Sequence, residues 1–186
     1  MSFFNLKKDF PVVLVLGGSL GAGSINTSLS EHINILRDSG CQWLWQTGKH
    51  YFENVNALIT VSFSENISVH GFINRMDYAY AAADIILSRA GAGTISELCL
   101  VGKPVILIPS PNVAEDHQTR NAKALSDKAS AVLLTDKQAS KTLAYEAIKL
   151  IADRNRRKML SENILKMADK DADIRIAEEV LKLVRK

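Results

Sequence analysis

Cysteine, aromatic residues and long apolar runs are scarce in this chain of 186 residues, and each shortage excludes a class of protein. The two cysteines, Cys41 and Cys99, match no zinc or redox spacing, so we expect buried thiols in a reducing compartment. No apolar run approaches the roughly 20 residues of a membrane-spanning helix, and no signal peptide is present. These absences predict a soluble cytoplasmic domain without a transmembrane segment.

A large excess of charge of one sign is also missing, because the formal net charge is only +3. No basic stripe interleaved with aromatic residues appears, so we expect no nucleic-acid partner. The mild positive charge suits an anionic small ligand or a transient contact with an anionic membrane. The length and the 47% of hydrophobic residues predict one globular domain with a sizeable core.

Strand and helix patterns alternate along the first three quarters of the chain. The predicted strands are Val12–Leu16, Gln42–Gln46, Leu58–Val61, Ile67–His70, Asp84–Ser88, Pro104–Pro109 and a weaker Ala131–Leu134. The clearest predicted helices are Asn26–Arg37, Met76–Ala83, Thr94–Val101 and Gln118–Ser126. Mostly uninterrupted apolar strands alternating with helices predict an α/β fold, a doubly wound, mainly parallel Rossmann-like sheet that binds ligands at the carboxyl ends of its strands.

Residues 138–186 contain no strand pattern and predict a tail of two or three helices. The last helix has an apolar stripe at helical spacing: Ile176, Ala177, Val180, Leu181, Leu183 and Val184. We expect this stripe to pack on the helices of the sheet; the alternative is a helix that crosses onto a neighbouring domain. Strand patterns begin close to Met1, so any second domain would precede it, with residues 1–11 as the connection.

Two glycine-rich turns, each between a strand and a helix, carry the strongest functional signal. They are Gly17-Gly18-Ser19-Leu20-Gly21-Ala22-Gly23 and Ser88-Arg89-Ala90-Gly91-Ala92-Gly93-Thr94. A helix that opens in this way leaves backbone N–H groups free at its positive end, where a phosphate binds readily. Two such turns in one domain indicate a ligand that carries further chemical groups in addition to a phosphate. A nucleotide-sugar fits this description best.

Other phosphate ligands fit less well. A dinucleotide fold needs an acidic residue at the tip of the following strand, but these tips carry Thr47 and Ser110. No P-loop motif is present. The Asp171-Ala172-Asp173 sequence resembles a metal-binding D-x-D, yet it precedes a helix, so N-capping and the helix dipole explain it better.

Two polar groups each have a structural and a ligand-binding explanation. Glu97 completes a Thr94-x-x-Glu97 capping box, which we favour from spacing alone, or it binds the two hydroxyls of a ribose. The segment 116–121 is either a helix start with Asp116 as N-cap or a set of polar groups suited to sugar hydroxyls.

An ordered set of motifs resembles the C-terminal half of the MurG family, from about Val12 to the end of the chain. The motifs are Gly17-Gly18-Ser19-x-Gly21-Ala22, His70-Gly71-Phe72-Ile73, Ala83-Asp84, Ser88-Arg89-x-Gly91-Ala92-x-Thr94-x-x-Glu97, Gly102-x-Pro104 and His117-Gln118-x-x-Asn121-Ala122. The resemblance implies the donor-binding half of a two-domain GT-B glycosyltransferase, which transfers N-acetylglucosamine from UDP-N-acetylglucosamine to a lipid-linked muramoyl-pentapeptide at the cytoplasmic face of the membrane.

The resemblance also assigns roles to matching residues. It implies that Glu97 binds the ribose, that the backbone of Ile73 faces the uracil, and that His117 and Gln118 contact the sugar with Asn121 nearby. Ser19 and the N–H groups of residues 92–94 would bind the diphosphate. The implied substrate-binding residues are Gly18, Ser19, Gly21, Phe72, Ile73, Gly91, Ala92, Gly93, Thr94, Glu97, His117, Gln118 and Asn121, with no metal and no cofactor.

The implied reaction is an inverting displacement at the anomeric carbon with UDP as leaving group. No residue here is a convincing base, so we expect the chain to bind the donor without transferring its sugar. Leu20 and Gly93 depart from residues common in the family. Three alternatives stay open: the separate subunit of a split lipid-linked transferase, a UDP-N-acetylglucosamine 2-epimerase, and a non-catalytic nucleotide-binding module.

Overall fold

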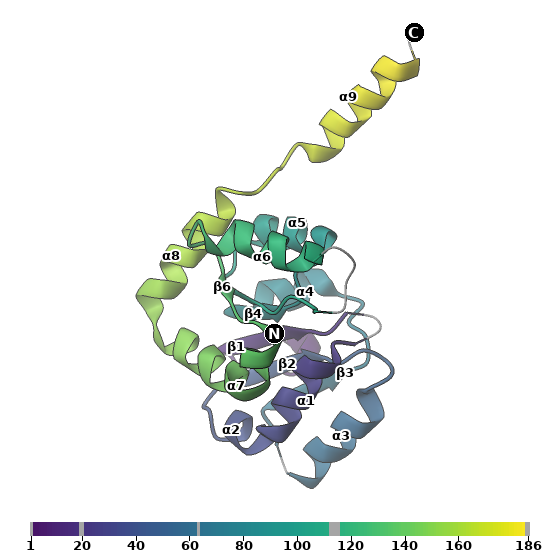
Figure 1. The fold of residues 1–186 in the computed structure, drawn as a ribbon. Helices are drawn as coiled ribbons and strands as arrows, with labels where there is room; N and C mark the ends of the chain where they lie inside the picture. The colour runs from purple at the N-terminus through teal and green to yellow at the C-terminus, as the bar shows by residue number, and fades with distance from the viewer. Residues whose placement is uncertain (1, 19–20, 63, 112–115, 185–186) are drawn as a thin grey trace.

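The computed structural model describes residues 2–18, 21–62, 64–111 and 116–184. It contains a six-stranded, wholly parallel sheet with the order β3-β2-β1-β4-β5-β6 (Figure 1). The strands are β1 (Val12–Leu16), β2 (Gln42–Gln46), β3 (Ile67–His70), β4 (Ile85–Ser88), β5 (Val105–Leu107) and β6 (Val132–Leu133). This is the predicted doubly wound α/β fold, in which the strand order reverses between β1 and β4.

An α-helix follows each of the six described strands, as the alternating patterns predict. They are the 3-10 turn η1 (Ser2–Phe4) and the α-helices α1 (Gly23–Glu31), α2 (Ile33–Arg37), α3 (Phe52–Val61), α4 (Met76–Ala82), α5 (Ala92–Val101), α6 (His117–Ser126), α7 (Asp136–Ala152), α8 (Arg154–Leu165) and α9 (Ala172–Val184). The predicted tail of helices after residue 138 is therefore confirmed. None of the described helices is both long and apolar enough to cross a bilayer.

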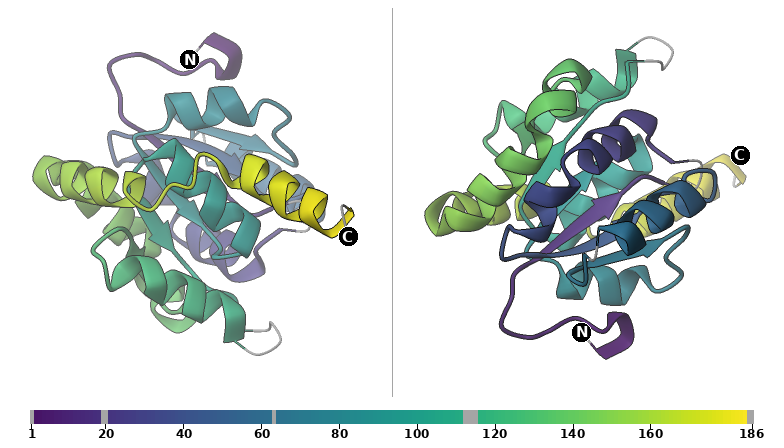
Figure 2. Two further views of the ribbon diagram at one scale, coloured as in Figure 1. Left: turned by 90° about the horizontal axis from the view of Figure 1, so that it is seen from above. Right: turned by 90° about the horizontal axis from the view of Figure 1, so that it is seen from below.

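The sheet is buried on both faces, and β1 shows how its alternating side chains divide the core. Val13 and Val15 pack into a cluster with α1, α2, α3 and α7, whereas Leu14 and Leu16 pack into a second cluster with α4, α5 and α6. The two further views show helices on both sides of the strands (Figure 2). Burial of both faces explains why the strands are continuous apolar runs. Cys41 and Cys99 are buried thiols, as predicted.

Two local predictions are wrong. The predicted strand Leu58–Val61 is the end of α3, because Val55, Leu58 and Ile59 follow helical spacing and bring one face onto the core while Val61 is exposed. The predicted helix Asn26–Arg37 is divided into α1 and α2 at His32. There the backbone N–H donates to the carbonyl of Leu29, three residues back, and the helical φ and ψ are lost.

The expected packing of α9 on the helices of the sheet is also wrong. Figure 1 shows α9 projecting away from the body beyond the end of α8. Its large apolar side chains are exposed, with Ile176 at 65%, Val180 at 53% and Leu183 at 76%. The stripe therefore forms on the helix but finds no surface to cover among the described residues.

Candidate functional site

The two glycine turns leave adjacent strands at the point where the strand order reverses. Leu16, the last residue of β1, is paired in register with Ser88, the last residue of β4. The chain after Leu16 leads to α1 on one face, and the chain after Ser88 leads to α5 on the other. A crevice at the carboxyl ends of the strands opens at such a switch point, so the fold brings the two predicted turns together.

The first turn requires glycine because the backbone comes close to its neighbours. A Cβ at Gly17 would lie 2.7 Å from the carbonyl oxygen of Gln46, and the N–H of Gly17 donates to that same oxygen at 2.8 Å. Gly21 has a φ of +87°, and a Cβ there would lie 2.5 Å from the ring of Tyr51. These glycines hold the turn against the end of β2. Ser19 and Leu20 lie outside the described residues.

The second turn presents the N-terminus of α5 without a side-chain cap. Gly91 is the N-cap residue in extended conformation, and no side chain of the described part of the chain caps the helix. The N–H groups of Ala92, Gly93 and Thr94 therefore lack intrahelical acceptors and lie at the positive end of the dipole. This is the arrangement that the sequence predicts for binding an anion.

The predicted capping box of Thr94 and Glu97 does not form. Thr94 is the third residue of α5 rather than its N-cap, because the helix begins at Ala92. Glu97 lies one turn further on, where its Oε2 accepts a hydrogen bond of 2.9 Å from the hydroxyl of Tyr80 on α4. Burial, reinforced by Glu97, raises the pKa of Tyr80, so its hydroxyl remains a donor. Glu97 is thus an exposed carboxylate whose described side-chain partner is the hydroxyl of Tyr80 on the neighbouring helix.

A cavity of about 290 Å³ connects the two turns with Glu97 and with the loop after β3. Its lining residues are Leu16, Gly17, Gly18, Gln46, Phe72, Ile73, Met76, Tyr80, Ser88, Arg89, Thr94 and Glu97. Five of them are residues predicted to bind substrate. The cavity therefore unites, in one place, motifs that are spread over almost eighty residues of the sequence.

A second cavity of about 420 Å³ is also lined by Arg89 and includes two further predicted residues, Gly21 and Gln118. It is lined by Gly21, Ala22, Gly23, Ser24, Tyr51, Arg89, Ser110, Pro111, Gln118 and Asp136. Arg89 lines both cavities, so they lie next to the same side chain. Their combined polar lining suits a ligand longer than a nucleoside alone.

Arg89 forms the principal ion pair of this region, a role that no sequence pattern predicts. Its Nη1 lies 2.6 Å from Oδ1 of Asp136 and also donates to the carbonyl oxygens of Ile108 and Pro109. Its Nη2 donates to the hydroxyl of Ser24 at 2.8 Å. The guanidinium therefore ties the β4–α5 turn to α1, to α7 and to the end of β5. The sequence signals were its place inside the second turn and its presence in the Ser88-Arg89-x-Gly91 motif.

The backbone predicted to face the uracil is partly engaged within the protein. The N–H of Ile73 donates to Oε1 of Gln46 at 3.0 Å, and both side chains are at least 95% buried. Phe72 beside it is 49% exposed. Gln46 is thus a further lining residue that the sequence motifs did not indicate.

The polar residues of α6 support the second turn. Gln118 accepts with Oε1 from the N–H groups of Ala90, at 3.3 Å, and of Ser110, at 2.9 Å. Asn121 donates through Nδ2 to the carbonyl of Ala90 at 3.0 Å. Asp116 is the N-cap residue of α6, as one of the two alternatives predicts, but its φ is +54° and its side chain makes no capping bond with the described residues.

Some predicted residues lie near the cavities without lining them. These are Gly91, Ala92, Gly93, His117 and Asn121. The D-x-D sequence is remote from both: Asp173 lies in the first turn of α9, where the helix dipole favours its charge. Within the described ranges, no three acidic, histidine or cysteine side chains cluster as metal ligands.

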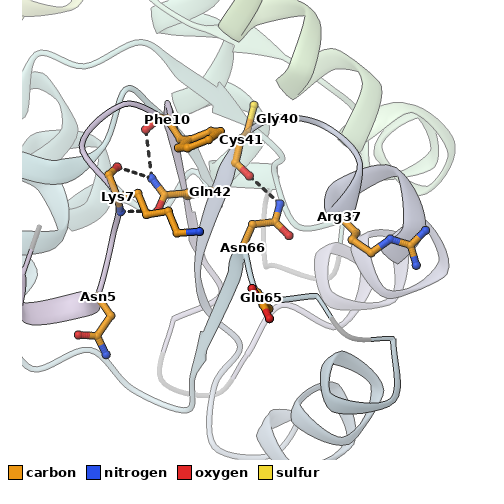
Figure 3. A pocket seen from close by; sticks show the side chains of 9 residues that line it. All are labelled: Asn5, Lys7, Phe10, Arg37, Gly40, Cys41, Gln42, Glu65 and Asn66. Atoms are coloured by element: carbon orange, nitrogen blue, oxygen red, sulfur yellow. Dashed lines mark hydrogen bonds between the residues drawn. The ribbon is translucent and has the colours of Figure 1, made fainter.

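A third cavity, of about 300 Å³, lies at the opposite, amino end of β2 and β3 (Figure 3). Two of its carboxamides, Gln42 and Asn66, bond to the backbone. Gln42 bonds to the N–H and carbonyl of Lys7 and to the carbonyl of Phe10, and Asn66 donates to the carbonyls of Leu36 and Cys41. Gln42 thus fastens Lys7 and Phe10 to the sheet, and Asn66 fastens the segment from Leu36 to Cys41, so these two side chains have a structural role.

Comparison with known proteins agrees with this geometry. Residues 12–176 match the model of the glycosyltransferase family 28 C-terminal domain. The chain is 46% identical over 186 residues to "UDP-N-acetylglucosamine--N-acetylmuramyl-(pentapeptide) pyrophosphoryl-undecaprenol N-acetylglucosamine transferase" of Parabacteroides distasonis, covering 100% of this chain and 50% of the relative. The protein of the same name from Porphyromonas gingivalis is 48% identical over 185 residues, covering 99% of this chain and 49% of the relative.

Solved structures show the same fold. The crystal structure of Acinetobacter baumannii MurG superposes with a TM-score of 0.82 at 26% identity, covering 97% of this chain and 52% of that one. UDP-GlcNAc 2-epimerase from Neisseria meningitidis shares the fold at a TM-score of 0.66 and 19% identity, covering 97% of this chain and 47% of that one. The chain spans about half the length of the curated relatives it matches. It belongs to the glycosyltransferase family 28 C-terminal domain family and corresponds to the C-terminal half of MurG.

Proposed function

We propose that this chain is the donor-binding domain of a transferase that moves N-acetylglucosamine from UDP-N-acetylglucosamine to a lipid-linked muramoyl-pentapeptide. The names of the relatives supply the reaction. The observation that carries the proposal is the single cavity lined by both glycine turns and by Glu97. An uncapped helix N-terminus beside a carboxylate suits a diphosphate joined to a ribose.

The nucleoside end of the donor would occupy the cavity between Ile73 and Glu97. Glu97 would accept hydrogen bonds from the ribose hydroxyls. The base would lie against the loop after β3, at Phe72 and Ile73. Since the N–H of Ile73 donates to Gln46, its carbonyl is the backbone group that would contact the edge of the base.

The diphosphate and the sugar would continue towards the second cavity. Gly18, Ser19 and Gly21 of the first turn, with Gly91 and the N–H groups of residues 92–94, would bind the diphosphate. His117, Gln118 and Asn121 would lie on the sugar side. Because Oε1 of Gln118 already accepts two backbone N–H groups, its amide nitrogen is the group that would donate to a sugar hydroxyl.

Transfer would proceed by attack of the acceptor hydroxyl on the anomeric carbon, with inversion and departure of UDP. The bond from that carbon to the diphosphate breaks as the new glycosidic bond forms. Negative charge then develops on the leaving diphosphate, where the N-terminus of α5 would stabilise it. The base that takes the hydroxyl proton is not assigned to any residue of this chain.

The acceptor site would belong to the rest of the protein, since the chain spans about half of its relatives' length. Residues 1–11 would form the connection to that part, and α9 would place its exposed stripe on it. The full-length protein would act at the cytoplasmic face of the membrane as a peripheral enzyme.

Calorimetry of the 186-residue chain tests donor binding. We expect heat and saturation with UDP and with UDP-N-acetylglucosamine, and none with NAD. Tight NAD binding with no response to UDP would overturn the proposal. An assay with a lipid-linked acceptor adds a second test, because we expect no transfer by this chain alone, and measurable turnover would refute that expectation.

A further inference from the structure

We propose that Tyr80 is a positioning residue that holds Glu97 in the orientation needed to bind the ribose of the donor. This inference rests on the proposed function and adds a residue to it. Tyr80 lies on α4 and Glu97 on α5, two helices that cover the same face of the sheet. The hydroxyl of Tyr80 donates to Oε2 of Glu97 at 2.9 Å, and both residues line the nucleoside cavity.

Glu97 needs such a partner because its side chain is exposed. An exposed glutamate samples many rotamers, and fixing it on binding costs conformational entropy. A hydrogen bond already present before the ligand arrives reduces that cost, as preorganisation does in other binding sites. No other hydrogen bond to the Glu97 side chain occurs within the described residues, so Tyr80 is the group that orients it.

The hydrogen-bond capacity of the pair leaves room for the ligand. An ionised carboxylate offers about four acceptor positions, and Tyr80 uses one of them. The other positions can accept from two ribose hydroxyls. Because burial and Glu97 raise the pKa of Tyr80, the phenol stays protonated and keeps donating at any pH at which the protein is handled.

The ring and the hydroxyl of Tyr80 have separable roles. The ring packs against the core cluster beneath α4 and α5, whereas only the hydroxyl reaches Glu97. Tyr80→Phe therefore removes the positioning bond and keeps the packing. Tyr78→Phe is a matched control, because Tyr78 lies on the same helix, is 42% exposed and contacts Phe3 and Arg75 instead.

The test is a titration of the wild-type chain, Tyr80→Phe, Glu97→Gln and the double variant with UDP and with 2′,3′-dideoxy-UDP. We expect Tyr80→Phe to weaken UDP binding about five- to tenfold and to leave the dideoxy nucleotide unaffected, since only the ribose hydroxyls meet Glu97. In the double variant, Tyr80→Phe should have no further effect beyond that of Glu97→Gln. Tyr78→Phe should match the wild type.

Three outcomes overturn the inference while leaving the proposed function intact. One is wild-type affinity of Tyr80→Phe for UDP. Another is an equal loss for UDP and the dideoxy nucleotide, which would show a general change in the cavity. The third is an additive loss in the double variant. Failure of the wild-type chain to bind UDP would instead contradict the proposed function itself.

Discussion

The two ends of the parallel sheet use their polar groups in opposite ways. At the amino end, Gln42 and Asn66 bond to backbone groups of neighbouring segments. At the carboxyl end, the N-terminus of α5 has no side-chain cap among the described residues, and Glu97 faces solvent with a single tyrosine partner. Both ends have cavities of similar size, about 300 and 290 Å³, so size does not distinguish a binding site from a structural gap. The carboxyl end differs in having a helix N-terminus that opens beside a carboxylate.

The largest expected effect is the loss of Arg89, which braces the carboxyl end. Arg89→Met leaves Asp136 without its cation and several oxygens without a donor, so the free energy of unfolding should fall by about 2–3 kcal/mol. Urea denaturation measures it. Arg37→Met is the matched control, since that arginine pairs with Asp38 at the surface, where solvent screens the pair, and its loss should leave the stability nearly unchanged. Equal effects of the two substitutions would contradict the bracing role.

A pair of substitutions sharpens the contrast between the two ends. Gln42→Leu should lower the free energy of unfolding by about 1–3 kcal/mol, because the N–H of Lys7 loses its acceptor, and should leave UDP affinity unchanged. Glu97→Gln should do the reverse, weakening UDP about tenfold with little change in stability. Denaturation and calorimetry on both variants give the comparison. It fails if Gln42→Leu weakens UDP binding as much as Glu97→Gln does.

Glycine-to-alanine substitutions distinguish positions that require glycine from positions that tolerate a side chain, by their effect on the free energy of unfolding. Gly93→Ala places a Cβ in open space on α5, so helix propensity should raise the free energy of unfolding by up to about 1 kcal/mol. Gly102→Ala should lower it by about 1 kcal/mol or more, because its φ is +67° and the Cβ would overlap Leu165. Thermal unfolding distinguishes the two. A stability loss in Gly93→Ala would show that the space is not open.

The smallest expected effect concerns His70 at the end of β3. Burial lowers the pKa of His70 below the ordinary value of 6.5, so the unfolded chain binds a proton more readily than the folded one. Stability contributed by this residue is therefore complete above pH 6.5 and falls on acidification below that value. His70→Asn should reduce the fall in melting temperature between pH 7.5 and 5.5. The exposed His50→Asn serves as control, and an unchanged pH dependence in His70→Asn would refute the assignment.

Sequence patterns predicted most of the fold because each strand is recognisable from a few consecutive residues. A continuous run of residues buried on both faces is typical of a central parallel strand, and four of the six strands, β1, β2, β4 and β5, are of this kind, whereas β3 and β6 are partly exposed. The strand prediction for Leu58–Val61 was wrong because four apolar or β-branched residues fit both a strand and the end of a helix. The packing of Val55 and Ile59 on the core shows that this segment belongs to α3.

The sequence by itself determined the α/β class, the two phosphate-type turns and, through ordered motifs, the family. All three can be recognised from the order of residues along the chain, and the affinity of the turns for phosphate follows from the dipole of the helix that each one opens. Only the tertiary structure decided which side chains brace those turns. Arg89 meets Asp136 across 47 residues, and Tyr80 reaches Glu97 from a separate helix. Contacts of this kind leave no periodicity in the sequence, because they arise only when the strands pair and the helices pack over them.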